Sequence, residues 1–158
     1  MAEVPTSVGV ITCMGAEGVI GCTVSSVVSV SVEADDEKIL FALKKGSRIG
    51  ILLGQGKRFT LSILNESQQD IATSAGGKLK HNELVSFLSE HIDSDSDDGF
   101  PIRESRVVFL LSVDQVFETT NSDVFFCKVH SARICGETKR RPLLYFRRSF
   151  RKIDEIPS

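Results

Sequence analysis

Several signatures of common protein classes are missing from this sequence. Its four cysteines form no CxxC pair and its three histidines show no ligand spacing with them, so a zinc site has little support. No apolar stretch approaches the length of a membrane span, and no charged segment followed by an apolar run opens the chain. Without a GxSxG motif or another recognisable nucleophile arrangement, hydrolysis is not indicated either.

The sequence also has no excess of positive charge. The 158 residues carry a net charge of −2, so neither a nucleic-acid partner nor a membrane surface is expected. With 41% hydrophobic and 25% charged residues, the chain has the composition of one ordinary globular domain, which we expect to span residues 1–158.

Unpaired cysteines are typical of a reducing compartment, and we therefore expect the protein to be cytoplasmic.

The apolar pattern predicts a mainly β protein with short helices. Strands are predicted over residues 8–14, 19–32, 39–43, 58–64, 106–117, 124–134 and 143–147. Short helices are predicted over residues 47–53, 66–75 and 81–92. Strands with interspersed helices, but without a regular βαβ alternation, favour a β-barrel with helical insertions.

Two motif-like stretches fail on inspection. Residues 93–99 (DSDSDDG) resemble the start of a calcium loop, but Asp98 stands where the turn needs glycine and a strand follows, so we reject a calcium site. Residues 54–56 (GQG) begin a dinucleotide fingerprint, yet Phe59 replaces its third glycine and a strand follows. A helix end and turn is the better interpretation.

Hydroxyl side chains dominate one predicted strand. Residues 23–32 (TVSSVVSVSV) contain five valines, five hydroxyl residues and no charge. Uncharged hydroxyls at a strand edge suit a planar polar ring or a phosphate that must be hydrogen-bonded. A half-buried strand with serine on its outer face explains the pattern equally simply.

Four short motifs in order resemble the flavin reductase-like family of split-barrel proteins. They are residues 4–12 (VPTSVGVIT), 21–31 (GCTVSSVVSVS), 58–64 (RFTLSIL) with Gln68 and Gln69 after it, and 142–147 (PLLYFR). The resemblance runs from about residue 4 to residue 150. It implies a split β-barrel of the FMN-binding type and a homodimer.

The same resemblance assigns a cofactor site. The implied contacts are Thr23, Val24, Ser25, Ser26, Ser47, Arg48, Ser62, Gln68, Gly76, Tyr145 and Arg147. In the family, the strand at Thr23 follows the flavin ring and ribityl chain, the loop at Ser47 and Arg48 grips the phosphate, and Tyr145 falls near the nicotinamide. The basic residues near the C-terminus either attract dinucleotide phosphates or form a solvated face. They are Lys139, Arg140, Arg141, Arg147, Arg148, Arg151 and Lys152.

The implied activity is reduction of FMN or FAD by NADH or NADPH, with the reduced flavin passed to a partner monooxygenase. Flavin and nicotinamide carry that chemistry, so neither a catalytic side chain nor a metal is required. Ser122 and Phe146 replace histidines that the family associates with the nicotinamide side. The absence of these histidines favours an alternative function, that of a flavin carrier or electron-transfer protein without efficient nicotinamide turnover.

Overall fold

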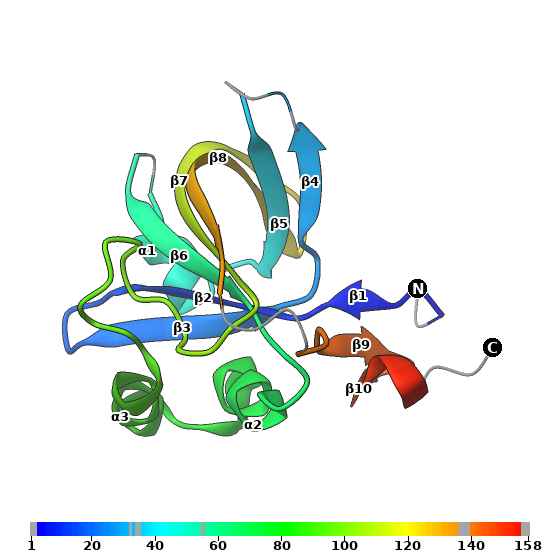
Figure 1. Ribbon diagram of the computed structural model, residues 1–158. Coiled ribbons are helices and arrows are strands. Elements are labelled where there is room, and N and C mark those ends of the chain that lie inside the picture. Colours follow the sequence, from blue (N-terminus) through cyan, green and yellow to red (C-terminus); the bar gives the residue numbers. More distant parts are fainter. Residues whose placement is uncertain (1–2, 32, 34–35, 55, 136–139, 156–158) are drawn as a thin grey trace.

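The computed structural model describes residues 3–31, 33, 36–54, 56–135 and 140–155 (Figure 1). The strands are β1 (Thr6–Ser7), β2 (Gly9–Met14), β3 (Val19–Val24), β4 (Val28–Ser31), β5 (Lys38–Lys44), β6 (Arg58–Ile63), β7 (Val107–Glu118), β8 (Ser122–Ile134), β9 (Leu144–Phe146) and β10 (Ser149–Arg151). The helical elements are α1 (Arg48–Leu52), α2 (Gln69–Thr73), the π-helical turn η1 (Ser74–Lys78), α3 (His81–His91) and the 3-10 turn η2 (Ile153–Glu155). The prediction of a mainly β fold with short helices is confirmed. Within the described residues, no helix is both long and apolar enough to cross a membrane.

Seven strands form one curved antiparallel sheet in the order β3-β2-β6-β7-β8-β5-β4. The sheet bends back on itself so that β5 and β4 rise beside β7 and β8, while β3 and β4 remain its two edges (Figure 1). A second, three-stranded sheet has the order β1-β9-β10, and β1 leads almost directly into β2. This open, strongly curved arrangement is the expected split barrel.

Alternating apolar residues fill the inside of the curve. In β5, Ile39, Phe41 and Leu43 are buried while their neighbours are partly exposed, as expected for a half-buried strand. The ring of Phe41 stacks on Phe125 at 5.3 Å and meets Phe59 edge-on at 5.8 Å. These aromatic contacts join β5, β8 and β6 across the core.

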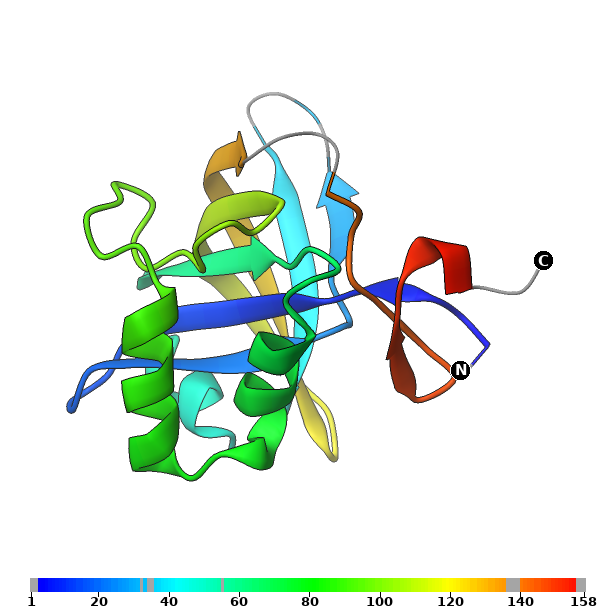
Figure 2. The same ribbon diagram turned by 60° about the horizontal axis from the view of Figure 1, so that its bottom comes forward.

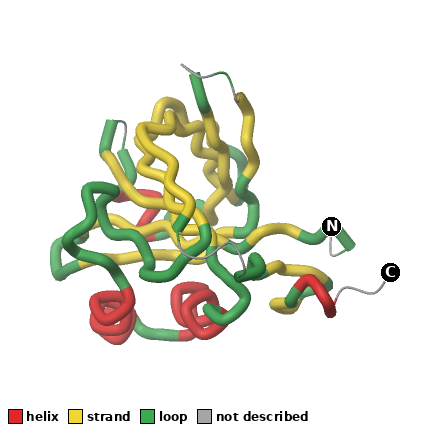
Figure 3. The backbone as a smooth tube through the Cα atoms, viewed as in Figure 1, coloured by secondary structure: helices red, strands yellow, loops and turns green. Residues whose placement is uncertain are grey.

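A second apolar cluster lies between the sheet and the helices. Figures 2 and 3 show α2 and α3 covering one side of β2 and β3. The fully buried Leu88 anchors α3 against β3, and Gly21 makes this close approach possible. A Cβ at Gly21 would lie 2.8 Å from the Ile11 carbonyl oxygen and 3.1 Å from Leu88 Cδ1. Such short distances exclude any larger residue without a shift of the backbone.

The predicted strand over residues 19–32 was wrong as a single element. β3 ends at Val24, and β4 begins at Val28 on the other edge of the sheet. Between them, the Ser26 hydroxyl accepts a hydrogen bond from the Ala42 N–H at 2.9 Å and lies 3.2 Å from the Ala42 carbonyl, to which it donates. The Ser26 side chain thus gives the backbone of Ala42 the hydrogen bonds that a neighbouring strand would otherwise supply, at the point where the chain crosses from one edge strand to the other. Val32 lies outside the described residues.

The predicted turn over residues 54–56 begins immediately after Leu53, the C-cap residue of α1, and Gly56 has a φ of +77°. Gln55 lies outside the described residues. The predicted helix over residues 66–75 is shorter than expected, because α2 starts at Gln69 and gives way to the π-helical turn at Ser74.

Buried polar side chains anchor the loop that follows α3. Thr12 donates to the Phe100 carbonyl at 2.6 Å, and Ser62 accepts from the Ile102 N–H at 3.0 Å. Thr60 donates to the Asp98 carbonyl at 2.6 Å and accepts from the Phe100 N–H at 3.0 Å. Further along the loop, the Asn65 amide donates to the Glu104 carbonyl and the Gln68 amide to the Arg103 carbonyl, each at 2.7 Å. These five side chains satisfy the backbone of residues 98–104, which has no regular strand partner of its own over most of its length.

Asp98 links this loop to β8 and makes the stability of the protein depend on pH. The pKa of its carboxyl is lowered, first by the hydrogen bond from Ser131 and then by Arg133. Because the folded-state pKa lies below the unfolded value of about 3.9, the stabilisation is present above that value and is lost as pH falls through the folded one. We expect Asp98→Asn to be less stable than the wild type at pH 7, with the difference shrinking below about pH 4. Urea unfolding at a series of pH values measures this, and a constant difference would contradict the assignment.

Candidate functional site

A cleft opens where β3 ends, α2 gives way to η1, and the β9–β10 hairpin faces both. Its volume is about 430 Å³, and its lining includes Thr23, Ser25, Gly76, Tyr145 and Arg148. A neighbouring hollow of about 470 Å³ shares Ser25, Tyr145 and Arg148 with it. Because the two share three lining residues, we treat them as one site and call it the serine–tyrosine cleft.

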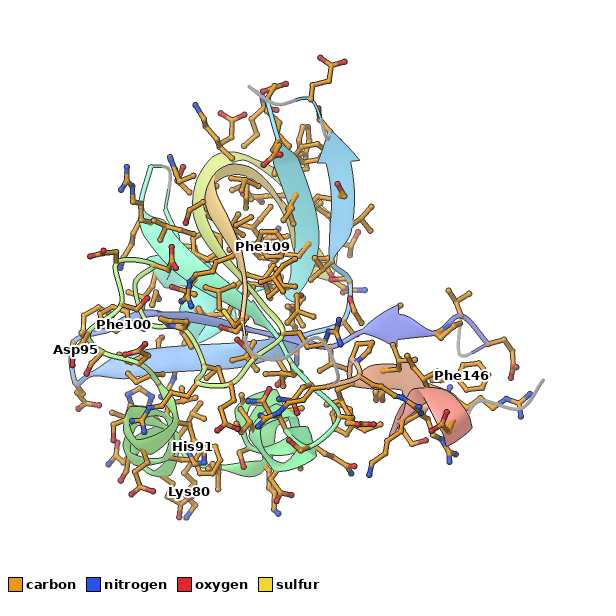
Figure 4. The ribbon with its side chains drawn as sticks, viewed as in Figure 1. Lys80, His91, Asp95, Phe100, Phe109 and Phe146 are labelled. Atoms are coloured by element: carbon orange, nitrogen blue, oxygen red, sulfur yellow. The ribbon has the colours of Figure 1, made fainter. Side chains whose placement is uncertain are left out.

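The remaining lining residues come from distant parts of the chain. The first hollow also contacts Val8, Ala72, Thr73, Ser149 and Phe150, and the second contacts Val4, Thr6, Ser26, Phe146 and Arg147. In Figure 4, Phe146 lies on β9, well away from Lys80 and His91 at the two ends of α3. The β9–β10 hairpin therefore supplies one wall of the cleft, and the pairing of β9 with β1 holds that wall in place.

Unpaired backbone donors lie beside this cleft. The N–H groups of Ser25 and Ser26, which line the cleft, have no hydrogen-bond partner among the described residues, because this stretch lies between two strands. Thr23, near the end of β3, donates its hydroxyl proton to the Ala72 carbonyl at 2.6 Å. Its oxygen remains able to accept. Free N–H donors and hydroxyls along one edge suit the carbonyl and nitrogen acceptors of a planar heteroaromatic ring.

Gly76 leaves room in the same wall. A Cβ built at this residue would lie 3.8 Å from both Cβ and Oγ1 of Thr23, which is ordinary van der Waals contact, so the backbone itself does not require glycine there. The space that a side chain would occupy is part of the cleft. Gly76 lies in η1, where the next residue, Gly77, has a φ of +109° and interrupts the helical path.

Six of the eleven predicted contacts line the serine–tyrosine cleft. They are Thr23, Ser25, Ser26, Gly76, Tyr145 and Arg147. Val24, which stands between Thr23 and Ser25, is buried in the core. The alternation of a strand accounts for this, since successive side chains point to opposite faces.

The structure does not bring Ser47 and Arg48 into this cleft. Ser47 is the N-cap of α1, and its hydroxyl accepts a hydrogen bond from the Gly50 N–H at 3.3 Å. Arg48 lines a separate hollow with Glu17, Ile51 and His81 among others. Their role as a phosphate site stays a prediction.

Ser62 and Gln68 have structural partners. Ser62 is fully buried and accepts from the Ile102 N–H, while the Gln68 side chain bridges the Asn65 N–H and the Arg103 carbonyl. Gln68 also borders a shallow hollow that it shares with Asp70, Glu90 and Arg103, outside the serine–tyrosine cleft. Both side chains hold the loop after α3, and their predicted cofactor contacts stay predictions.

Sequence reasoning had counted Arg148 only as part of a basic cluster. In the structure it lines both hollows, whereas Arg147 beside it is paired with Glu3 through contacts of 2.9–3.1 Å. The predicted strand over residues 143–147 missed this turn, because β9 covers only Leu144–Phe146 and Arg147 and Arg148 connect it to β10. Lys139 of the basic cluster lies outside the described residues.

The cysteines show no sign of redox reactivity. Burial raises the pKa of Cys22 and that of Cys127 to about 12, and it also raises the pKa of Cys13. A thiol with a raised pKa is protonated at neutral pH and is a poor nucleophile. All four cysteines are free.

An open, curved antiparallel sheet with a polar cleft at the point where its edge strands part defines a split β-barrel of the cofactor-binding class. The model of the flavin reductase-like domain matches residues 1–154 of the chain. The chain therefore belongs to the flavin reductase-like domain family. A search of curated protein sequences found no significant match.

Solved structures of this class share the fold across nearly the whole chain. Component B of nitrilotriacetate monooxygenase from Mycobacterium thermoresistibile has 27% identity and a TM-score of 0.82, covering 99% of this chain and 86% of that one. The flavin reductase of styrene monooxygenase from Pseudomonas putida S12 has 24% identity and a TM-score of 0.78, covering 99% and 96%. An NADH:FAD oxidoreductase of Streptomyces globisporus C-1027, solved with NAD and FAD fragments, has 19% identity and a TM-score of 0.81, covering 99% and 90%.

Proposed function

We propose that this protein is an oxidoreductase that uses NADH or NADPH to reduce FMN or FAD and passes the reduced flavin to a partner monooxygenase. Family membership over residues 1–154 supports the reaction class. The observation that carries the site is the serine–tyrosine cleft, where the N–H groups of Ser25 and Ser26, unpaired among the described residues, lie in a wall shared with Thr23 and Tyr145. We take Thr23, Ser25 and Ser26 as the flavin-contacting edge. We also propose one domain over residues 1–158.

The residues of the cleft fit a flavin. The N–H groups of Ser25 and Ser26 donate to ring acceptors, the Thr23 oxygen accepts, and the gap at Gly76 leaves space beside them. Tyr145 on the facing hairpin, partly exposed, supplies an aromatic surface for a second ring. When bound, the flavin and the reduced nicotinamide supply the redox chemistry themselves, a hydride transfer between the two. The protein accelerates the reaction by binding and orienting both rings and by excluding water from the contact between them.

An anaerobic reduction assay tests this proposal. FMN or FAD is mixed with the protein, NADH or NADPH is added, and bleaching of the oxidised flavin band is followed. FAD with NADH is the first pair to try, because one structural neighbour is described as an NADH:FAD oxidoreductase. Catalytic bleaching is the expected result. Flavin binding without bleaching would favour the carrier, the alternative that Ser122 and Phe146 support by standing where the family often has histidine. Failure to bind any flavin would overturn both.

The predicted phosphate loop is tested by removing its polar groups. We expect Ser47→Ala with Arg48→Ala to weaken flavin binding about tenfold, since a charge-assisted hydrogen bond contributes roughly 1.5–3 kcal/mol. Fluorescence titration with FMN measures the effect. Loss of the Ser47 cap also costs about 1 kcal/mol of stability. Arg48→Ala alone leaves the cap intact and is the matched control. Unchanged affinity in both variants would remove this loop from the site.

We further propose a homodimer that uses the edge strand β4. Val28 and Val30 are 51% and 46% exposed there, on an edge that carries no charge among its described residues. Uncharged edges with apolar side chains pair readily with another strand. We expect Val30→Lys to shift the protein toward monomer in sedimentation velocity. Ile51→Lys, which alters an exposed apolar residue on α1, should leave the dimer unchanged. A wild-type monomer would overturn the proposal.

Two further assignments complete the proposal. The partner that receives reduced flavin is a flavin-dependent monooxygenase, in keeping with the monooxygenase components among the structural neighbours. The compartment is the cytoplasm, which the four free cysteines support.

A further inference from the structure

The turn between β9 and β10 holds two arginines in a backbone conformation that favours glycine. Arg147 and Arg148 have φ values of +49° and +62°. They connect strands paired from Phe146 to Ser149, so they form a two-residue hairpin loop in which asparagine and glycine are the usual residues. A non-glycine residue in this region is strained, because its Cβ lies too close to the following carbonyl oxygen. Strain of this kind at a cleft indicates a side chain that is kept for function.

The two arginines differ in what their side chains contact. Arg147 makes a bidentate ion pair with Glu3 and lies 5.2 Å from the Phe146 ring centre, so its charge is already compensated. Arg148 has no ion pair or hydrogen bond through its guanidinium among the described residues. Three other arginines, Arg133, Arg140 and Arg141, each have an acidic partner. Within the part of the chain that the structure describes, Arg148 is therefore a cation without a counter-charge.

The surroundings of Arg148 favour an anion. It lines both hollows of the serine–tyrosine cleft, and none of the residues that line either hollow is acidic. Thr6, Ser25 and Ser149 add hydroxyl groups to these walls. A planar guanidinium with nearby hydroxyls matches a phosphate group, which accepts two hydrogen bonds from one arginine.

We propose that Arg148 binds a phosphate of the dinucleotide that occupies the serine–tyrosine cleft. This deepens the proposed function and rests on it. The loop at Ser47 and Arg48 is the predicted position of the flavin phosphate. We therefore expect the phosphate that Arg148 binds to belong to the pyrophosphate of the nicotinamide dinucleotide. The pyrophosphate of FAD has the same chemistry, and the experiment separates the two sources.

The test variant is Arg148→Asn, because asparagine tolerates a positive φ and lacks the charge. We expect the affinity for NAD⁺ to fall about tenfold or more, while affinities for FMN and riboflavin stay unchanged. Equilibrium titration followed by protein NMR or calorimetry reads binding without turnover. Equal losses of affinity for NAD⁺ and FAD, with the affinity for FMN unchanged, would show that Arg148 binds the pyrophosphate of either dinucleotide. A loss confined to FAD would move the contact to the flavin.

Arg141→Asn is the matched control, since it removes the same charge from an arginine that is paired with Asp154 outside the cleft. Equal losses in both variants would show a general charge effect and overturn the proposal, as would unchanged binding in Arg148→Asn. Inorganic pyrophosphate provides an independent probe. If the wild type binds no flavin, weaker pyrophosphate binding in Arg148→Asn still supports the phosphate site, while equal binding overturns it.

Relief of backbone strain gives a second readout. Arg148→Gly removes the side chain from a left-handed position, so we expect the melting temperature to stay constant or to rise by about 2–4 °C. Weaker NAD⁺ binding together with equal or higher stability separates a binding residue from a structural one. A clear drop in melting temperature would show that the side chain stabilises the turn, and would overturn the argument from strain.

Discussion

Replacing Thr60 with valine is expected to lower the free energy of unfolding by roughly 2–4 kcal/mol. The side chain is fully buried, donates to the Asp98 carbonyl at 2.6 Å and accepts from the Phe100 N–H at 3.0 Å. Valine has nearly the same shape but satisfies neither group, and each unpaired polar group costs about 1–3 kcal/mol when water cannot replace the partner. Urea denaturation of wild type and variant measures the difference.

The hairpin between β7 and β8 offers a matched control. Thr119 also pairs with one backbone carbonyl and one backbone N–H, both of Ser122, but it is exposed. Water can replace these bonds in Thr119→Val, so we expect a loss of less than about 1 kcal/mol. Equal losses at the two positions would contradict the view that burial of the loop backbone makes Thr60 important.

The strand pattern of the fold could be read from the sequence because it is local. The stretch at residues 58–64 alternates with period two and forms β6, and the apolar spacing of residues 81–92 forms α3. The break after Val24 was not predicted, because nothing in an uninterrupted run of valines and serines marks the point where the chain changes partner. That point depends on Ala42, whose backbone binds the Ser26 hydroxyl from a distant strand.

The candidate site was predicted only in part for a similar reason. Hydroxyl side chains indicate that something is hydrogen-bonded, but not what it is. Ser25 lies at the cleft, whereas Ser62 binds the backbone of the loop at Ile102. The unpaired charge of Arg148 could not be separated from that of Arg147 either, because the partner of Arg147 is Glu3, near the opposite end of the chain. Such pairings follow from long-range packing and not from local spacing.

Filling the cleft at Gly76 is expected to weaken flavin binding in proportion to the added volume. The Cβ position is in ordinary contact with Thr23 and φ is not in the positive range, so alanine fits the empty protein. Any added methyl then occupies space that the bound ring needs. Overpacking of this kind typically costs 1–3 kcal/mol, so we expect Gly76→Val to raise the dissociation constant of FMN by about tenfold or more and Gly76→Ala by less.

Stability should move in the opposite direction from affinity. Replacing a non-strained helical glycine with alanine stabilises a protein by about 0.4–1 kcal/mol, because the unfolded chain loses freedom. Gly54→Ala is the control, since its Cβ would meet no atom within 4 Å, its φ is not positive, and it lies outside the cleft. It should therefore leave FMN binding unchanged. Fluorescence titration measures the affinity for FMN. If this affinity falls from Gly76→Ala to Gly76→Val while the melting temperature does not fall, the flavin lies against the η1 turn. Unchanged affinity in Gly76→Val would move the flavin out of the serine–tyrosine cleft, because a ring seated there cannot avoid the added side chain.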